Sequence, residues 1–416
     1  MKILLVIPPA FYMTSDRVFP PLGILYVCAW LKKKGKHPEV LDLTGEKEWK
    51  EIFRKAVKIK KPDFIGFTAT TPDLPAVISL LKICKKINSD IKTVIGGAHA
   101  TVDPYSLYMF DKIVIGDGFS ASQKAFSDDS SKFIKEPLIK DLDKIPLPDR
   151  EAVNLNKYSY YLDGKKAANI MSHLGCPFSC AFCCGRKSEY YNKPRFRSPK
   201  KVLEEMDTLN KKYGYEAFVF YDDEFNLSKN YALKLCSLLK KRKYIWRAPV
   251  RADLLDEKLA FEMKKSGCVE VTVGVESGSE KVLKLCGKKT TPEINSRARK
   301  ICAQAGIRFK AFTVVGLPFS SFEDEKLTEK WLLENLPDSV DINVNTPYPS
   351  SPEYENKRKY KIKFKADYFK KPVSYKYDPK KYSGFCDNSY LSPDEMVKIR
   401  SKMAEKINRA LKNRFK

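Results

Sequence analysis

Apolar runs alternate with amphipathic segments along the first 118 residues. The apolar runs, which we interpret as strands, cover 2–8, 38–43, 63–69, 92–97 and 112–116. Helical periodicity marks the stretches near 22–34, 47–60 and 74–87. Continuous apolar strands bracketed by amphipathic helices are typical of a parallel, doubly wound sheet, because both faces of each strand are then covered. We therefore predict a flavodoxin-like (Rossmann-type) α/β domain over residues 1–120.

A second alternation of strands and helices begins near residue 166. The expected strands cover 167–172, 217–221, 245–250, 269–275, 308–315 and 340–345. The expected helices include 198–213, 229–243, 255–266 and 291–305. This pattern predicts a partial (β/α)6 TIM-like barrel over residues 166–348, with its active site in the loops that follow the strands. The proline-punctuated stretch at 121–165 is predicted to be a linker.

The last segment, residues 349–416, is basic and ends in an apolar stripe with helical spacing. Ser392, Pro393 and Glu395 form the pattern of a capping box with proline at the first helical position. The stripe consists of Met396, Ile399, Met403, Ile407 and Leu411. We predict a small α-helical C-terminal region whose apolar face packs against the rest of the protein.

The net charge is strongly positive, at +26, with 77 Lys and Arg residues against 51 Asp and Glu residues. Such a charge permits nucleic acid, an anionic membrane surface or an acidic substrate as partner. The lysines are scattered and form no dense arm, which favours a solvated surface over a nucleic-acid interface. No apolar run reaches the roughly 18 residues that a spanning helix needs, and no signal segment is recognised, so we expect no membrane span and a cytoplasmic protein.

Four of the eleven cysteines lie between Cys176 and Cys184. Cys176, Cys180 and Cys183 are spaced as Cys-x-x-x-Cys-x-x-Cys, whereas structural zinc usually takes its ligands as two separated pairs. Three thiolates on one loop suit a cubane iron–sulfur cluster that keeps one iron open for a small molecule. A basic, zinc-containing nucleic-acid-binding protein stays open as an alternative.

The cysteine motif, with Phe182 just before its last cysteine, resembles the signature of the radical S-adenosylmethionine superfamily. The segments "YDDEF" (221–225), "GVESGSE" (274–280) and "VVGLP" (314–318) are similar to motifs that this superfamily carries after successive strands. The resemblance implies a 4Fe-4S cluster held by Cys176, Cys180 and Cys183. It also implies S-adenosylmethionine contacts from Phe182, Arg251, Glu276, Ser277, Gly316 and Pro318. No catalytic side chain is assigned from the sequence.

The N-terminal domain resembles the cobalamin-binding domain that one subgroup of this superfamily carries upstream of its barrel. The resemblance covers "FPPLGILYVCAWLKKKGKHPEVLDL" (19–43), "GFTATT" (66–71) and "GGAHAT" (96–101). It implies cobalamin contacts from Pro8, Thr68, Thr70, Gly96, Gly97 and Gly116. Two departures stand out. No Asp-x-His-x-x-Gly motif is present, so we expect no protein imidazole beneath the cobalt, and the usual "GEGE" is "GDGF" at 116–119.

Together these resemblances imply an enzyme that cleaves S-adenosylmethionine to a 5′-deoxyadenosyl radical. The implied outcome is cobalamin-dependent methylation of an unactivated carbon in a small-molecule substrate, with a flavodoxin or ferredoxin as one-electron reductant. A radical RNA-modifying enzyme of the methylthiotransferase type is the alternative that the positive charge favours. That group uses three further N-terminal cysteines, whereas residues 1–118 contain Cys28 and Cys84.

Overall fold

The computed structural model describes residues 1–11, 15, 17–185, 188–365 and 383–414. The chain forms two compact units. The N-terminal unit comprises the described residues of 1–160 together with Ser188–Tyr190, and the barrel unit comprises the other described residues. Within the part of the chain that the structure describes, no helix is both long enough and apolar enough to cross a lipid bilayer.

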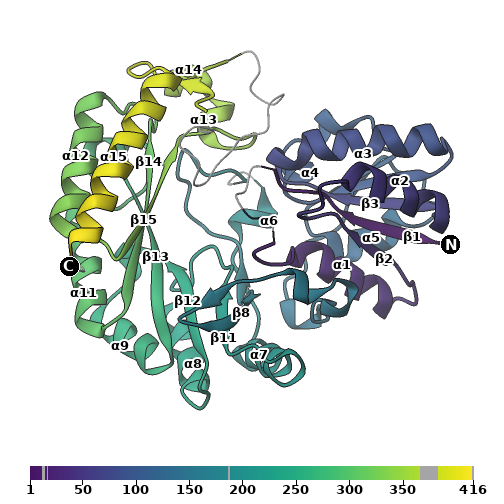
Figure 1. Cartoon of the computed structure of the whole chain (residues 1–416), viewed down its shortest axis with the longest axis horizontal. Coiled ribbons are helices and arrows are strands. Elements are labelled where there is room, and N and C mark those ends of the chain that lie inside the picture. Colours follow the sequence, from purple (N-terminus) through teal and green to yellow (C-terminus); the bar gives the residue numbers. More distant parts are fainter. Residues whose placement is uncertain (12–14, 16, 186–187, 366–382, 415–416) are drawn as a thin grey trace. The chain divides into compact units, whose positions relative to one another are not determined.

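The N-terminal unit is built on a parallel sheet with the strand order β2-β1-β3-β4-β5-β6 (Figure 1). The strands are β1 (Ile3–Ile7), β2 (Glu39–Asp42), β3 (Phe64–Thr68), β4 (Lys92–Gly96), β5 (Lys112–Ile115) and β6 (Phe133–Lys135). This is the flavodoxin-like order, with its switch point between β1 and β3. The predicted fold class and the first five strands are confirmed. The sixth strand comes from 119–165, a segment in which the sequence shows no periodicity.

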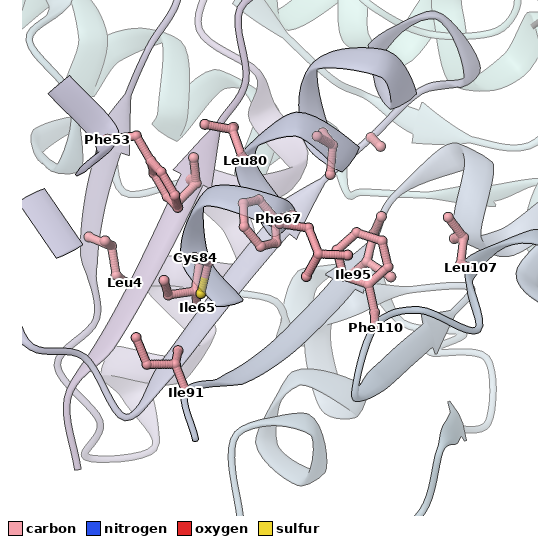
Figure 2. Close-up of a cluster of buried hydrophobic side chains, with 14 of the residues drawn as sticks. Leu4, Phe53, Ile65, Phe67, Leu80, Cys84, Ile91, Ile95, Leu107 and Phe110 are labelled. Atoms are coloured by element: carbon pink, nitrogen blue, oxygen red, sulfur yellow. The ribbon is translucent and has the colours of Figure 1, made fainter. Parts of the chain in front are cut away.

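The longer helices of this unit each bury an apolar face. They are α1 (Leu22–Lys33), α2 (Trp49–Lys60), α3 (Leu74–Ile87), α4 (Ala98–Val102) and α5 (Gly118–Ala125). On α3 the buried residues Val77, Leu80, Leu81 and Cys84 recur at helical spacing. Figure 2 shows how Leu80 and Cys84 meet strand residues in the buried cluster. Burial of each such large apolar side chain contributes about 1.5–3 kcal/mol.

The barrel unit is built on a sheet with the order β15-β14-β13-β12-β11-β8-β7, in which β7 alone is antiparallel to its neighbour (Figure 1). The strands are β7 (Tyr161–Leu162), β8 (Lys165–Ile170), β11 (Ala217–Phe220), β12 (Ile245–Val250), β13 (Cys268–Glu276), β14 (Arg308–Val315) and β15 (Ser339–Val344). The outermost strands, β15 and β7, do not pair with each other, so the barrel stays open. All six predicted strands are confirmed.

The helices between these strands begin at conventional N-caps. They are α7 (Pro199–Tyr213), α8 (Lys229–Leu239), α9 (Glu257–Lys265), α10 (Glu280–Leu285), α11 (Pro292–Ala305) and α12 (Phe322–Asn335). Side-chain oxygens of Ser198, Ser228 and Thr291 accept backbone N–H groups at three of the N-termini. Inside the sheet, Trp246 is fully buried against Phe220 and Phe225.

The chain's last helix, α15 (Pro393–Arg414), covers β15 and lies along α12. Its capping box forms as predicted, because Ser392 donates to Glu395 and receives the Glu395 N–H in return. Met396 and Met403 are buried, which confirms the packing face. The shorter elements are β9 (His173–Leu174), α6 (Glu189–Asn192), β10 (Arg195–Phe196), α13 (Pro352–Glu355), α14 (Lys357–Tyr360), β16 (Lys363–Phe364) and β17 (Cys386–Asp387).

Candidate active site

The cysteine loop, residues 176–183, follows β8 and the short strand β9. Cys176 and Cys180 are 9% and 7% exposed, Cys183 is half-buried and Cys184 is exposed. The loop is held by backbone hydrogen bonds: the Ala181 N–H donates to the Cys286 carbonyl (2.8 Å), and the Cys183 N–H donates to the Cys180 carbonyl (3.1 Å). These bonds hold the backbone of the loop that carries all three cysteines of the motif, at the carboxyl end of the sheet.

Two carboxylates that follow β11 fix the entrance to this loop. Asp222 accepts the N–H groups of Ser172 (2.6 Å) and His173 (3.2 Å), together with the Ser172 hydroxyl. Asp223 accepts the Gly175 N–H at 2.9 Å. Both aspartates belong to the "YDDEF" segment that resembles a superfamily motif. The structure shows both of them bonded to the segment that leads into Cys176.

His173 is a buried ring beside the same carboxylate, with its Nδ1 3.4 Å from Asp222 Oδ2. Burial disfavours the charged imidazole, but Asp222, with Asp223 and Glu224 beyond it, more than offsets that cost and raises the pKa of His173. His173 is therefore one of the buried polar residues that surround the entrance to the cysteine loop.

Arg251 follows β12 and lies flat against the cysteine loop. Its guanidinium carbon is 3.6 Å from the centre of the Phe178 ring, and its nitrogens donate to both oxygens of Asp253 (2.9 and 3.0 Å) and to the Lys288 carbonyl (2.9 Å). Asn226 holds the backbone of Arg251 through two reciprocal hydrogen bonds of 2.9 Å. The arginine is thus a fixed positive charge at the carboxyl end of the sheet.

Glu276 lies at an irregularity, where the register of β13 on β14 shifts between Gly274 and Glu276. Its φ of +63° is left-handed, an uncommon conformation for a residue other than glycine. The carboxylate folds back along the strand to accept a hydrogen bond from Lys288 Nζ (3.0 Å). A Cβ on Gly274 would lie 2.3 Å from Glu276 Oε1, so this arrangement requires glycine at 274.

Ser277 is buried beside Glu276, and its hydroxyl is already engaged. It lies 3.2 Å from the Thr328 hydroxyl and accepts the Ser279 N–H at 3.1 Å. Phe182, on the cysteine loop, is half-buried and packs against a small apolar cluster that contains Cys286. The cofactor contacts that the resemblance implies for both residues stay predictions.

Gly316 and Pro318 form the turn after β14. At Gly316, where φ is +79°, an added Cβ would lie 2.3 Å from Met396 Sδ on α15, so this side of the glycine is filled by the C-terminal helix. The Gly316 N–H donates to Glu325 (2.8 Å), which also accepts the Ser320 hydroxyl. Glu325 and Met396 therefore fix the conformation of this turn. The S-adenosylmethionine contacts that the resemblance implies for Gly316 and Pro318 stay predictions.

Two charges at this site were not selected from the sequence. Glu224 is half-buried, and its removal from water raises its pKa to about 7. Lys288 is buried, and burial acts to lower its pKa, but Glu276 and Glu224 more than offset that effect and raise it. Glu224 stands inside the quoted "DDEF" motif, which was a usable signal. Lys288 lies in "GKKTT", where no sequence pattern distinguishes it from the other lysines.

In the N-terminal unit, the predicted cobalamin residues follow β1, β3, β4 and β5. Thr68 pairs with Gly96 across β3 and β4, and a Cβ on Gly97 (φ +97°) would lie 2.9 Å from the Thr68 hydroxyl oxygen. Gly116 donates its N–H to the Thr101 hydroxyl (3.0 Å). Since ligands of open parallel sheets bind at the carboxyl ends of the strands, this edge suits a flat ligand that approaches backbone closely.

The other predicted cobalamin residues differ in their surroundings. Pro8 is buried at the end of β1, whereas Thr70 is exposed and its hydroxyl donates to Asp73 (2.6 Å) in a local turn. Next to this turn, His99 shares hydrogen bonds with Thr71 (2.9 Å) and Ser106 (3.0 Å), as expected of a satisfied polar residue.

The donor set fits the implied groups. Three thiols on one loop suit a 4Fe-4S cluster, and Gly96, Gly97 and Gly116 keep the backbone free of side chains at the carboxyl ends of β4 and β5, where a flat ligand can approach it. Among the described residues, no three Cys, His, Asp or Glu side chains are grouped as ligands of a single metal ion.

A half-open β/α barrel with a three-cysteine loop, preceded by a flavodoxin-like unit, defines the class of protein. Residues 170–332 match the model of the radical SAM superfamily, and residues 12–125 match that of the B12 binding domain. The chain belongs to the radical SAM superfamily, in the subgroup that carries a B12 binding domain. The radical SAM domain implies a 4Fe-4S cluster and S-adenosylmethionine, and the B12 binding domain implies cobalamin.

Relatives of known name agree with this assignment. An uncharacterized methyltransferase of Pyrococcus horikoshii is 30% identical over 384 residues, which cover 85% of this chain and 83% of the relative. The anaerobic magnesium-protoporphyrin IX monomethyl ester cyclase of Rubrivivax gelatinosus is 31% identical over 80% of this chain and 65% of its own length. The structure of the radical S-adenosylmethionine methyltransferase TsrM of Kitasatospora setae shares the fold, with a TM-score of 0.66 at 18% identity over 84% of this chain and 74% of that one.

Proposed function

We propose that the protein methylates an unactivated carbon of a small molecule by a radical reaction. Cys176, Cys180 and Cys183 would hold the cluster, and Arg251 and Glu276 would meet the polar groups of S-adenosylmethionine. Loops after β1, β3, β4 and β5 would hold cobalamin. When bound, these groups supply the electron, the radical and the methyl group, so the chain's task is to fix their geometry and exclude water.

One observation carries this proposal: the cysteine loop and the polar residues after β11, β12 and β13 meet at one edge of the sheet. Asp222 bonds to the loop's entrance, Arg251 stacks on Phe178, and the segment after α10 bonds to Ala181. The loop that carries the nearly buried Cys176 and Cys180 is thus in contact with Arg251 and with the segment that leads to Lys288. An ordinary structural metal knuckle needs none of these charges.

The partners that we propose are a small-molecule substrate and a one-electron reductant of the flavodoxin or ferredoxin type. A methylthiotransferase acting on RNA is disfavoured by the N-terminal unit. Its Cys28 and Cys84 are completely buried, and burial raises their pKa values to about 12 and about 11. Such thiols are poorly suited to serve as ligands of a second cluster.

The test is anaerobic purification and cluster reconstitution, followed by incubation with S-adenosylmethionine, cobalamin and dithionite. We expect iron and sulfide in cluster stoichiometry, a corrinoid absorbance and release of 5′-deoxyadenosine. Replacing Cys176, Cys180 or Cys183 by Ala should abolish iron retention, whereas the neighbouring Cys184→Ala variant should retain it. If the triple alanine variant kept its iron and its reactivity, the proposal would be overturned.

Ring closure is the second candidate outcome, because three relatives are named as cyclases. Transfer of a labelled methyl group from S-adenosylmethionine to the product separates the two outcomes. Methylation incorporates the label, whereas ring closure does not.

A further inference from the structure

Three buried charged side chains lie near the cysteine loop, Arg251, Glu276 and Lys288, together with the half-buried Glu224. Lys288 Nζ lies 3.0 Å from Glu276 Oε1, and the two side chains are 7% and 11% exposed. Arg251 donates to the Lys288 carbonyl, which connects the two cations through one peptide group. Charges this far from solvent are weakly screened, so they act on their surroundings over several ångströms.

The segment that carries Lys288 packs directly on the cysteine loop. The Cys286 carbonyl accepts the Ala181 N–H (2.8 Å), and a Cβ on Gly287 would lie 3.6 Å from the Ser179 carbonyl oxygen. Residues 286 and 287 therefore contact the loop at Ala181 and Ser179, the two neighbours of Cys180. Arg251 meets the same loop at Phe178.

We propose that Lys288 is a positioning and charge-setting residue that raises the reduction potential of the cluster. This inference rests on the proposed function, since it needs the cluster on Cys176, Cys180 and Cys183. Reduction adds one negative charge to an assembly that already carries three thiolates, and a nearby buried cation stabilises that charge. The net charge around such a cluster is one of the factors that set its potential.

The two cations beside this loop have different carboxylate partners. Arg251 is already paired with both oxygens of Asp253. Lys288 is paired with Glu276, the carboxylate that the resemblance implies for S-adenosylmethionine, while the segment before Lys288 packs on the cysteine loop.

The experiment is a redox titration of the reconstituted full-length protein, followed by electron paramagnetic resonance at pH 8.5, where carboxylates left without a partner stay ionised. In Lys288→Met, the ratio of reduced to oxidised cluster at a fixed potential should fall about tenfold, which corresponds to about 59 mV for a one-electron couple. The matched control is Lys289→Met, which removes the exposed neighbouring lysine and should leave the ratio unchanged.

A second pair of variants separates charge from folding. Glu276→Gln should raise the reduced fraction, and Lys288→Met/Glu276→Gln should bring it back toward that of the wild type. If Lys288→Met alone loses the cluster, Lys288→Met/Glu276→Gln is compared with Glu276→Gln instead. The ratio of reduced to oxidised cluster should then be about tenfold lower in the double variant.

An unchanged potential in a cluster-loaded Lys288→Met variant would overturn the inference, and so would an equal fall in Lys289→Met. A wild-type protein that binds no cluster at all would instead refute the proposed function. The two failures are therefore distinguishable.

Discussion

Replacing Asp222 tests whether a buried carboxylate outside the cysteine motif determines the order of the cysteine loop. Asp222 is 6% exposed and accepts two backbone N–H groups and one hydroxyl from Ser172 and His173, both of which are completely buried. In Asp222→Ala these donors lose their acceptor, and the buried His173 loses its negative partner at 3.4 Å.

The expected cost follows from these contacts. Each buried donor left unpaired costs about 1–3 kcal/mol, and removing one partner of a buried charge pair costs about 3–5 kcal/mol. Because these effects overlap, we expect a total of about 3–5 kcal/mol for Asp222→Ala. A loss of about 4 kcal/mol favours opening of the segment by roughly a thousandfold. The isosteric Asp222→Asn variant keeps one acceptor oxygen and should lose less.

Two assays check this expectation. Urea unfolding of the barrel unit measures the global loss, and hydrogen exchange of the amides at 172–175 measures local opening. Iron retention after reconstitution reports the consequence at Cys176. Glu204→Ala, which removes an exposed carboxylate from α7, is the control. Unchanged amide protection in Asp222→Ala, with a stability within about 1 kcal/mol of the wild type, would refute the reasoning.

Three further predictions concern packing, backbone strain and pH. Trp246→Ala empties the centre of the barrel sheet and should cost about 3–5 kcal/mol in urea unfolding; a loss below about 1 kcal/mol would contradict the packing. Gly97→Ala places a Cβ at φ +97° against Thr68, so it should lower the free energy of unfolding by about 1–3 kcal/mol and weaken cobalamin binding in a spectroscopic titration. The control Gly23→Ala adds a Cβ that meets no atom within 4 Å and should be neutral. Equal effects of the two substitutions would rule out backbone strain at Gly97. Burial raises the pKa of Glu325 to about 7, above its unfolded value, so its favourable contribution is complete below about pH 4.3 and is lost as pH rises through 7. Glu325→Gln should therefore lose less stability than the wild type between about pH 4.5 and pH 7.5, whereas the exposed Glu323→Gln should behave like the wild type; identical slopes for all three proteins would show that Glu325 does not titrate in this range.

Much of the fold could be predicted because its signals are local. The strands of both sheets are short apolar runs, and the helices between them repeat their apolar residues every three or four positions. The capping box at Ser392 and the stripe from Met396 onward were recognisable for the same reason. The strand β6 was missed, because Phe133–Lys135 is too short to show a period and gains its stability by pairing with β5.

The sequence by itself determined the strand and helix order and the spacing of Cys176, Cys180 and Cys183, since neighbours along the chain encode both. Only the tertiary structure decided what surrounds them: Asp222 on the loop entrance, Met396 against Gly316, and Lys288 beside Glu276. These contacts join residues from different elements. A single lysine or aspartate carries no local pattern that distinguishes it, so its role follows from burial and from the partner that folding places next to it.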